Sequence, residues 1–274
     1  MTDRSTATAP RRSALDGVRL RPGGVVASEV LKLVTVRSTW WSIGVAVVLS
    51  LGLAAILASD IAGEPIAELA TARAVRASSV HLQVIGLVIA VLGALSIGGE
   101  YATGMIRSTY TAVPRRLPSL LARAGVVAGA AFLVGTVTTA GSFTLISSGL
   151  ASRGAAPVLD GEVFGALLGG AFYLAVVGAF SVGIGALLRS SAAAIGISVG
   201  VLFVLPVVAA LAGALLRAQW VADASPYLLS RLGGTLSDLP DDSGIGLAAA
   251  VAGALGWALV ALVPALVATR VRDV

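Results

Sequence analysis

The chain has 274 residues, of which 57% are hydrophobic and only 12% charged, and its mean hydropathy is +0.96. Soluble globular domains carry about 25% charged residues, so this composition excludes a water-soluble domain and indicates a protein whose main solvent is lipid. The net charge of +5 comes without basic patches interleaved with aromatic residues. We therefore expect affinity for lipid headgroups and no nucleic-acid partner. Cysteine is absent, which excludes disulfides and thiolate metal sites.

The first 24 residues have no apolar core and are rich in Arg, Ser, Thr, Ala and Pro. This composition predicts a disordered tail over residues 1–24 rather than a signal peptide or a folded domain.

Residues 25–38 are predicted to form an amphipathic helix that lies in the membrane interface. Apolar and charged residues fall largely on different sides of this helix, and two tryptophans follow that would anchor the next span. The apolar side holds Val26, Val30, Leu33 and Val34, and the interfacial group comprises Glu29, Lys32, Arg37, Trp40 and Trp41. The alternative is that this stretch simply extends the first span beyond the membrane.

Six apolar segments are long enough to cross a membrane, because a hydrocarbon core of about 30 Å is spanned by roughly 20 helical residues. They are residues 40–58, 80–98, 126–150, 163–188, 191–216 and 245–268. Arg189 is the single charge between residues 163 and 216, so it marks the turn between two spans. The sequence therefore predicts an all-α polytopic membrane protein, with one six-span membrane domain over residues 39–274.

The orientation follows from the distribution of cations. An even number of spans places both termini on one side of the membrane. The tail, the second and fourth loops and the C-terminus then hold 14 of the 19 Lys and Arg residues, and the other loops hold 5. By the positive-inside rule, we expect both termini in the cytoplasm.

The six predicted spans contain no Asp, Glu, Lys or Arg. Ion-coupled carriers usually place such residues at membrane depth, so a secondary transporter is disfavoured. An HExxH zinc site needs two histidines, and the chain has only His81. A Ser-His catalytic pair would also have to use His81, at the mouth of a span, where we expect an interfacial residue instead. We therefore expect no metal site and no catalytic residues.

Hydroxyl groups are frequent in the third predicted span, and they could line a transport path. More commonly, such groups bond the backbone carbonyls of their own or neighbouring helices. The candidate path residues are Thr136, Thr139 and Ser142, together with Pro206, which removes a backbone donor and is expected to kink the fifth span. The segment 217–244 is long enough for a short re-entrant or interfacial helix.

The loop after the second predicted span is too polar to cross a membrane. We expect a helix to begin at Glu100, whose carboxylate would lie near the positive N-terminal end of the helix dipole. Met105, Ile106 and Tyr110 would form an apolar docking face beside Arg107, and Pro114 would end the element. The alternative is an ordinary solvated connector.

Three stretches carry a resemblance to a known family. The first reads ASEVLKL and continues to RSTWW within residues 27–41, the second reads EYATGMIRSTYTAVPRR over residues 100–116, and the third reads GALLRS over residues 185–190, followed by LFVLP at 202–206. Together they resemble the permease subunits of type-two exporters among ATP-binding-cassette (ABC) transporters, in particular the actinobacterial branch. The resemblance covers nearly the whole chain from residue 27, and the second stretch is its most specific part.

The resemblance implies a six-span permease in a bacterial plasma membrane, which exports a drug, an antibiotic, a lipid or a similar amphiphile. Such a subunit pairs with a second permease, identical or related, and docks onto two cytoplasmic ATPase subunits that bind ATP and Mg²⁺. It also implies that residues 25–38 form an elbow helix and that roughly 100–110 form the coupling helix, with Glu100, Tyr101, Thr103, Gly104, Met105, Ile106, Arg107 and Tyr110 facing the ATPase. The chain has no GxxxxGK[ST] loop, so ATP hydrolysis is expected on the partner.

Two other function classes stay open at the level of the sequence. One is a membrane partner of an ATPase that serves in sensing or immunity, and the other is an ATP-independent channel or carrier.

Overall fold

The computed structural model describes residues 22–60, 69–105, 116–216, 219–240 and 244–271. Within these ranges the chain is helical and contains no strand. Six helices are long and apolar enough to cross a membrane. They follow the six apolar segments of the sequence, which confirms the predicted count of spans and the all-α, multi-pass membrane class.

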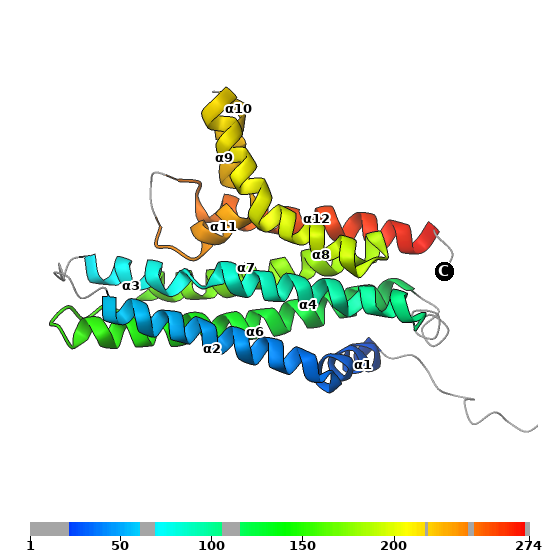
Figure 1. Ribbon diagram of the computed structural model, residues 1–274, viewed down its shortest axis with the longest axis horizontal. Helices are drawn as coiled ribbons and strands as arrows, with labels where there is room; N and C mark the ends of the chain where they lie inside the picture. The colour runs from blue at the N-terminus through cyan, green and yellow to red at the C-terminus, as the bar shows by residue number, and fades with distance from the viewer. Residues whose placement is uncertain (1–21, 61–68, 106–115, 217–218, 241–243, 272–274) are drawn as a thin grey trace, which may run out of the picture.

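The first four spans run closely side by side (Figure 1). They are formed by α2 (Arg37–Asp60), by α4 (Leu82–Thr103) after the short α3 (Ala70–Ser79), by α6 (Arg116–Ala151) and by α7 (Gly161–Leu188). The helices α4 and α6 extend beyond the predicted spans 80–98 and 126–150, so each carries a polar turn past the apolar stretch.

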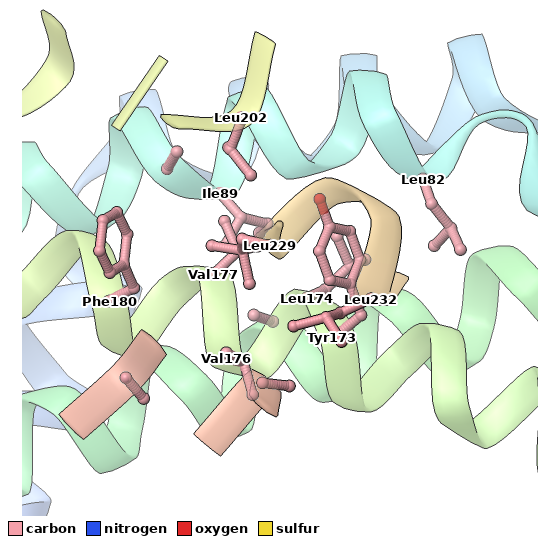
Figure 2. Packing of buried hydrophobic residues seen from close by; sticks show 14 of the residues in the cluster. Leu82, Ile89, Tyr173, Leu174, Val176, Val177, Phe180, Leu202, Leu229 and Leu232 are labelled. Carbon is pink, nitrogen blue, oxygen red and sulfur yellow. The ribbon is translucent and has the colours of Figure 1, made fainter. Parts of the chain in front are cut away.

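Helix α7 is the centre of the bundle and packs against α6, α4 and α12 (Leu247–Val271). Its side chains Tyr173, Leu174, Val177 and Phe180 form the main core with residues from α4 and from the outer helix α11 (Figure 2). Asp160 caps its start by accepting hydrogen bonds from the backbone N–H groups of Glu162 and Val163. Arg189 ends it in the left-handed conformation, as its position in the predicted turn requires.

The crossing of α7 and α12 depends on small residues. A Cβ on Gly183 would lie 2.8 Å from the carbonyl carbon of Ala261, so the two backbones touch without side chains between them. Close approach of this kind is how helices associate in lipid, where apolar surface alone gives no reason to pack.

The fifth span is bent. Helix α8 (Ser191–Val199) continues through a π-helical turn, η2 (Gly200–Val204), into α9 (Leu205–Leu216). Pro206 lies two residues after the end of the π-helical turn and lacks the N–H that a regular α-helix would use. Figure 1 shows α9 turning away from the other spans, and none of its residues is buried. The kink expected at Pro206 is thus present.

The segment after the fifth span, where one short re-entrant or interfacial helix was expected, forms short helices. Helix α10 (Gln219–Ala224) lies beside α9, a 3₁₀ turn η3 (Ser225–Tyr227) follows, and α11 (Leu229–Leu236) packs back onto α7 and α12.

Helix α1 (Pro22–Thr35) is separate from the first span, because the helix breaks at Val36 before α2 begins. It is not an extension of that span, and it begins and ends about one turn earlier than the predicted 25–38. Val25 and Glu29 are buried on the side that faces α6, and Val26, Val30, Leu31 and Val34 are exposed on the other sides. The indole N–H of Trp40 donates to the Val34 carbonyl oxygen at 2.7 Å across the break.

Candidate functional site

The most unusual chemistry in the described residues is a group of four charged side chains at one end of the bundle. This end, here called the α1 end, holds α1, the last turns of α4, the start of α6 and the end of α12 (Figure 1). The four side chains, called the charge network below, are Glu29 and Lys32 of α1, Glu100 of α4 and Arg123 of α6. Glu29, Glu100 and Arg123 are each only 4% exposed.

Arg123 is the hub of the charge network. Its Nε donates to Glu29 Oε2 at 2.7 Å, its Nη1 donates to the Ser96 carbonyl oxygen at 2.9 Å, and its Nη2 donates to Glu100 Oε1. The guanidinium is a rigid, planar fork of N–H donors, so one side chain can hold three acceptors at fixed angles. Through this fork α6 is bonded both to α1 and to two successive turns of α4.

Lys32 completes the charge network from the surface side. Its ammonium lies 2.9 Å from Glu29 Oε1 and 2.9 Å from Glu100 Oε1. Two carboxylates therefore face two cations, and the group is neutral overall. An isolated buried charge is costly in a medium of low dielectric constant, and breaking a buried pair by removing one partner costs about 3–5 kcal/mol. The arrangement is consequently a rigid one, since each ion depends on the others.

The structure corrects the expected start of the coupling helix. Glu100 does not begin a helix but lies in the last turn of α4, which ends at Thr103. Gly104 follows with φ of 71°, the left-handed conformation that commonly terminates a helix. Met105 comes next and is half exposed. Ile106, Arg107 and Tyr110 lie outside the described residues, so a coupling helix beyond Met105 stays a prediction.

The six apolar segments predicted as spans hold no Asp, Glu, Lys or Arg, but the helices that contain them are longer than the segments. The second and third candidate spanning helices extend over Ala70–Tyr101 and Leu117–Ala151, and their ends beyond the apolar segments carry the charged residues Arg73, Arg76, Glu100 and Arg123. Glu100 and Arg123 lie within a few turns of their helix ends and are paired with each other.

Neighbours of the charge network include several residues flagged in the sequence. The guanidinium carbon of Arg189 lies 5.5 Å from the ring centroid of Tyr101, within cation–π range. Arg37 begins α2, and Trp40 and Trp41 are 57% and 75% exposed at the start of that helix. The exposed indoles suit a membrane interface, although their location in a bilayer stays a prediction.

The hydroxyl groups of α6 serve the backbone. Thr136 donates to the Phe132 carbonyl at 2.9 Å, and Thr139 donates to the Gly135 carbonyl at 2.9 Å and across to the Leu167 carbonyl of α7 at 3.2 Å. Thr139 and Ser142 are buried between helices. The commoner use of such hydroxyls, bonding to backbone carbonyls, is thus observed for Thr136 and Thr139, and a path lined by Thr136, Thr139, Ser142 and Pro206 stays a prediction.

His81, directly before α4, is buried in the bundle, and its expected depth at a membrane interface stays a prediction. It is 2% exposed, and its Nδ1 lies 3.4 Å from the hydroxyl oxygen of Ser142, which is fully buried. A serine beside a histidine is the start of a nucleophilic dyad. Here both groups are buried in the bundle, where the contact joins the residue directly before α4 to α6.

Sequence reasoning identified Glu29, Lys32 and Glu100 but missed Arg123. The signal for Arg123 was a single cation placed just before a long apolar run, with no carboxylate near it in sequence. Its partners are 94 and 23 residues away, so only the fold brings them together.

Comparison with known proteins adds no family: no protein-family model matches the chain, and no curated protein matches it. The fold itself defines the class of this molecule, a multi-pass helical membrane protein with six spans.

Proposed function

We propose that this chain is the permease subunit of an ABC exporter, and that the segment after α4 couples it to a separate ATPase. The observation that carries the proposal is the position of the charge network. Glu29 and Lys32 come from the first stretch of family resemblance, and Glu100 comes from the second. Although these stretches are 68 residues apart at Lys32 and Glu100, their charged side chains are bonded to one another.

The charge network supplies a physical route for coupling. A partner that pulls on the segment beyond Met105 would act on the last turn of α4, where Glu100 is held by Arg123 of α6 and Lys32 of α1. Because these bonds are buried and mutually dependent, a displacement of that turn would be passed to α1 and α6 as a unit. The proposal thus assigns α1 the part of an elbow helix, with its exposed Val26, Val30 and Leu31 in the membrane interface.

The same proposal implies the other subunits of the transporter. Two ATPase subunits would bind ATP and Mg²⁺ on the cytoplasmic side, and a second permease, identical or related, would complete the path for an amphiphilic cargo. The α1 end would then face the cytoplasm of a bacterium, as the cation distribution favours.

The orientation can be tested directly because the chain lacks cysteine. Ser152→Cys places a thiol on an exposed position beyond α6, and Ser28→Cys places one on an exposed position of α1. We expect a membrane-impermeant thiol reagent to label Ser152→Cys, but not Ser28→Cys, in intact cells. Labelling of Ser28→Cys from outside would reverse the proposed topology.

The coupling proposal is tested on the segment that begins at Gly104. Gly104→Pro cannot adopt a φ of 71°, because proline fixes φ near −65°. We expect this variant to lose ATPase co-purification and most ATP-dependent transport. Ile106→Ala and Arg107→Ala should weaken ATPase binding roughly tenfold or more if they are buried anchors.

The control is Val158→Ala at the opposite end of the bundle, where the side chain is 62% exposed. It should bind the ATPase and transport as the unmodified chain does. Normal ATPase binding and transport in all three variants of the loop would show that the segment is only a connector.

One observation favours a second candidate, an ATP-independent carrier. Ion-coupled carriers use buried carboxylates in their spans, and Glu100 is a buried carboxylate in a span. Its position at the end of α4 and its bonds to Arg123 and Lys32 argue for the first candidate. Transport that stops with an ionophore and continues without ATP would select the carrier.

A further inference from the structure

A cavity of about 450 Å³ lies beside the charge network at the α1 end. It is bounded by α1, by the first turn of α2, and by α4 and α6, and its volume falls in the range of small-molecule sites. Neither the coupling proposal nor the packing of the bundle requires this space.

The lining of the cavity changes from polar to apolar along the helices. Leu92 and Leu95 precede Gly99 and Glu100 on α4, which runs toward the α1 end, and Val126 and Val127 follow Arg123 on α6, which runs away from it. At 1.5 Å per residue, Leu92 and Glu100 are separated by roughly 12 Å along the helix. The polar groups therefore lie at the α1 end, and the apolar wall lies deeper in the membrane. A lipid in one leaflet has the same order, with its polar headgroup at the membrane surface and its apolar chains deeper in the membrane.

The charge that the cavity presents is positive, although the charge network is neutral. The Lys32 side chain is 36% exposed, and those of Glu29, Glu100 and Arg123 are only 4–5% exposed. Glu29, Glu100 and Arg123 also line the cavity, but the Lys32 side chain is its most accessible charge. This selects an anionic headgroup over a cationic one.

The start of α2 supplies further donors to the same end of the cavity. Ser38 and Thr39 line it from the first helical turn, where the Thr39 backbone N–H donates to the Val36 carbonyl oxygen at 3.1 Å and the Ser38 and Thr39 hydroxyls are side-chain donors. Thr39 is only 8% exposed, yet its hydroxyl makes no hydrogen bond within the part of the chain that the structure describes. A hydroxyl on the wall of the cavity can donate a hydrogen bond to a polar atom in it.

We infer that this cavity binds an anionic phospholipid from the leaflet at the α1 end. The phosphate lies against Lys32 and the first turn of α2, and an acyl chain follows Leu92, Leu95 and Val126 into the membrane. The site goes beyond the proposed coupling function and does not depend on it, because the lipid binds the permease chain alone.

The test measures bound lipid on the purified full-length chain without any ATPase. The chain, in a non-ionic detergent, is incubated with equal amounts of phosphatidylglycerol and phosphatidylcholine, and the lipids retained through gel filtration are quantified by mass spectrometry. We expect phosphatidylglycerol to be enriched. Lys32→Gln should reduce the ratio of the two lipids about fivefold, the effect of one Lys near an anionic surface. Lys32→Arg should keep it.

A second variant fills the cavity without touching a charge. Gly99 lines the cavity, and a Cβ at this position has open space around it. Gly99→Leu should therefore reduce retention of both lipids while the protein elutes unchanged. The matched control is Gly129→Leu on an exposed side of α6, where a Cβ also meets nothing and which does not line the cavity. It should retain both lipids normally.

Three results would overturn the inference. The first is equal retention of the two lipids by the unmodified chain, and the second is normal phosphatidylglycerol retention in both Lys32→Gln and Gly99→Leu. The third is displacement of the lipid by millimolar glycerol phosphate, which would show a site for a free phosphate group and not for a lipid. If Lys32→Gln does not fold, the comparison of Gly99→Leu with Gly129→Leu decides.

Discussion

The two ends of the bundle hold their ion pairs in opposite ways. At the α1 end, Arg123 is bonded to Glu29 and Glu100 with all three side chains 4–5% exposed. At the opposite end, Arg76 of α3 is bonded to Asp238 at 3.0 Å, but these side chains are 68% and 34% exposed. The bond lengths are similar, and the surroundings are not. Burial makes the charges of the first group depend on one another, whereas water can replace either partner of the second.

The largest expected effect comes from removing the hub of the buried group. Arg123→Met keeps much of the side-chain volume but leaves Glu29 and Glu100 buried without their main partner. We expect a loss of about 3–5 kcal/mol in the free energy of unfolding. The measurement is an unfolding titration of the purified chain in mixed micelles. A change below about 1 kcal/mol would mean that water reaches these carboxylates.

The next effect is smaller and tests mutual dependence. Glu29→Gln removes one charge from the network and keeps the shape, and we expect a cost of about 1.5–3 kcal/mol for the lost charged hydrogen bonds. In the double variant with Arg123→Met, the loss in the free energy of unfolding should be smaller than the sum of the two single losses by about 1 kcal/mol or more. The reason is that both changes break the same Arg123–Glu29 bond. Strict additivity in the same titration would show that α1 and α6 are not coupled through this pair.

The smallest effect belongs to the opposite end. Arg76→Ala should change the free energy of unfolding by less than about 1 kcal/mol, since the pair is exposed. Raising the salt concentration should reduce this difference further, while the cost of Arg123→Met stays nearly constant, because buried pairs are screened much less than exposed ones. The titrations are repeated at low and high salt, and an equal salt response at both ends would remove the distinction between them.

Much of the fold could be predicted because the signals for it are local. Each span can be recognised from an apolar run of sufficient length. The turn between the fourth and fifth spans can be recognised from Arg189 alone. The ends of α4 and α6 were harder to predict from the sequence. Glu100 and Arg123 lie in helical turns beyond the apolar segments, and their charged partners come from other helices. Gly104 is a sequence signal for the end of α4, since glycine commonly ends helices in the left-handed conformation.

The candidate site was predictable only in its parts. Glu29, Lys32 and Glu100 stood out because they are charged residues in otherwise apolar surroundings, but nothing in their spacing shows that they meet. His81 illustrates the same limit, since its contact Ser142 lies 61 residues away in the sequence. Contacts between distant helices depend on how the spans pack, and hydropathy carries no information on that packing.

The central place of α7 has a consequence for how the protein is made. Two of its packing partners, α4 and α6, precede it in the chain, but α12 is synthesised last. Until then, the side of α7 that carries Gly183 has no helix to meet. Chains generally fold as synthesis proceeds from the N-terminus. The packing around α7 is therefore complete only after α12 has been synthesised. A nascent chain cut off before residue 247 would carry an open seam in the membrane, which makes it a substrate for degradation.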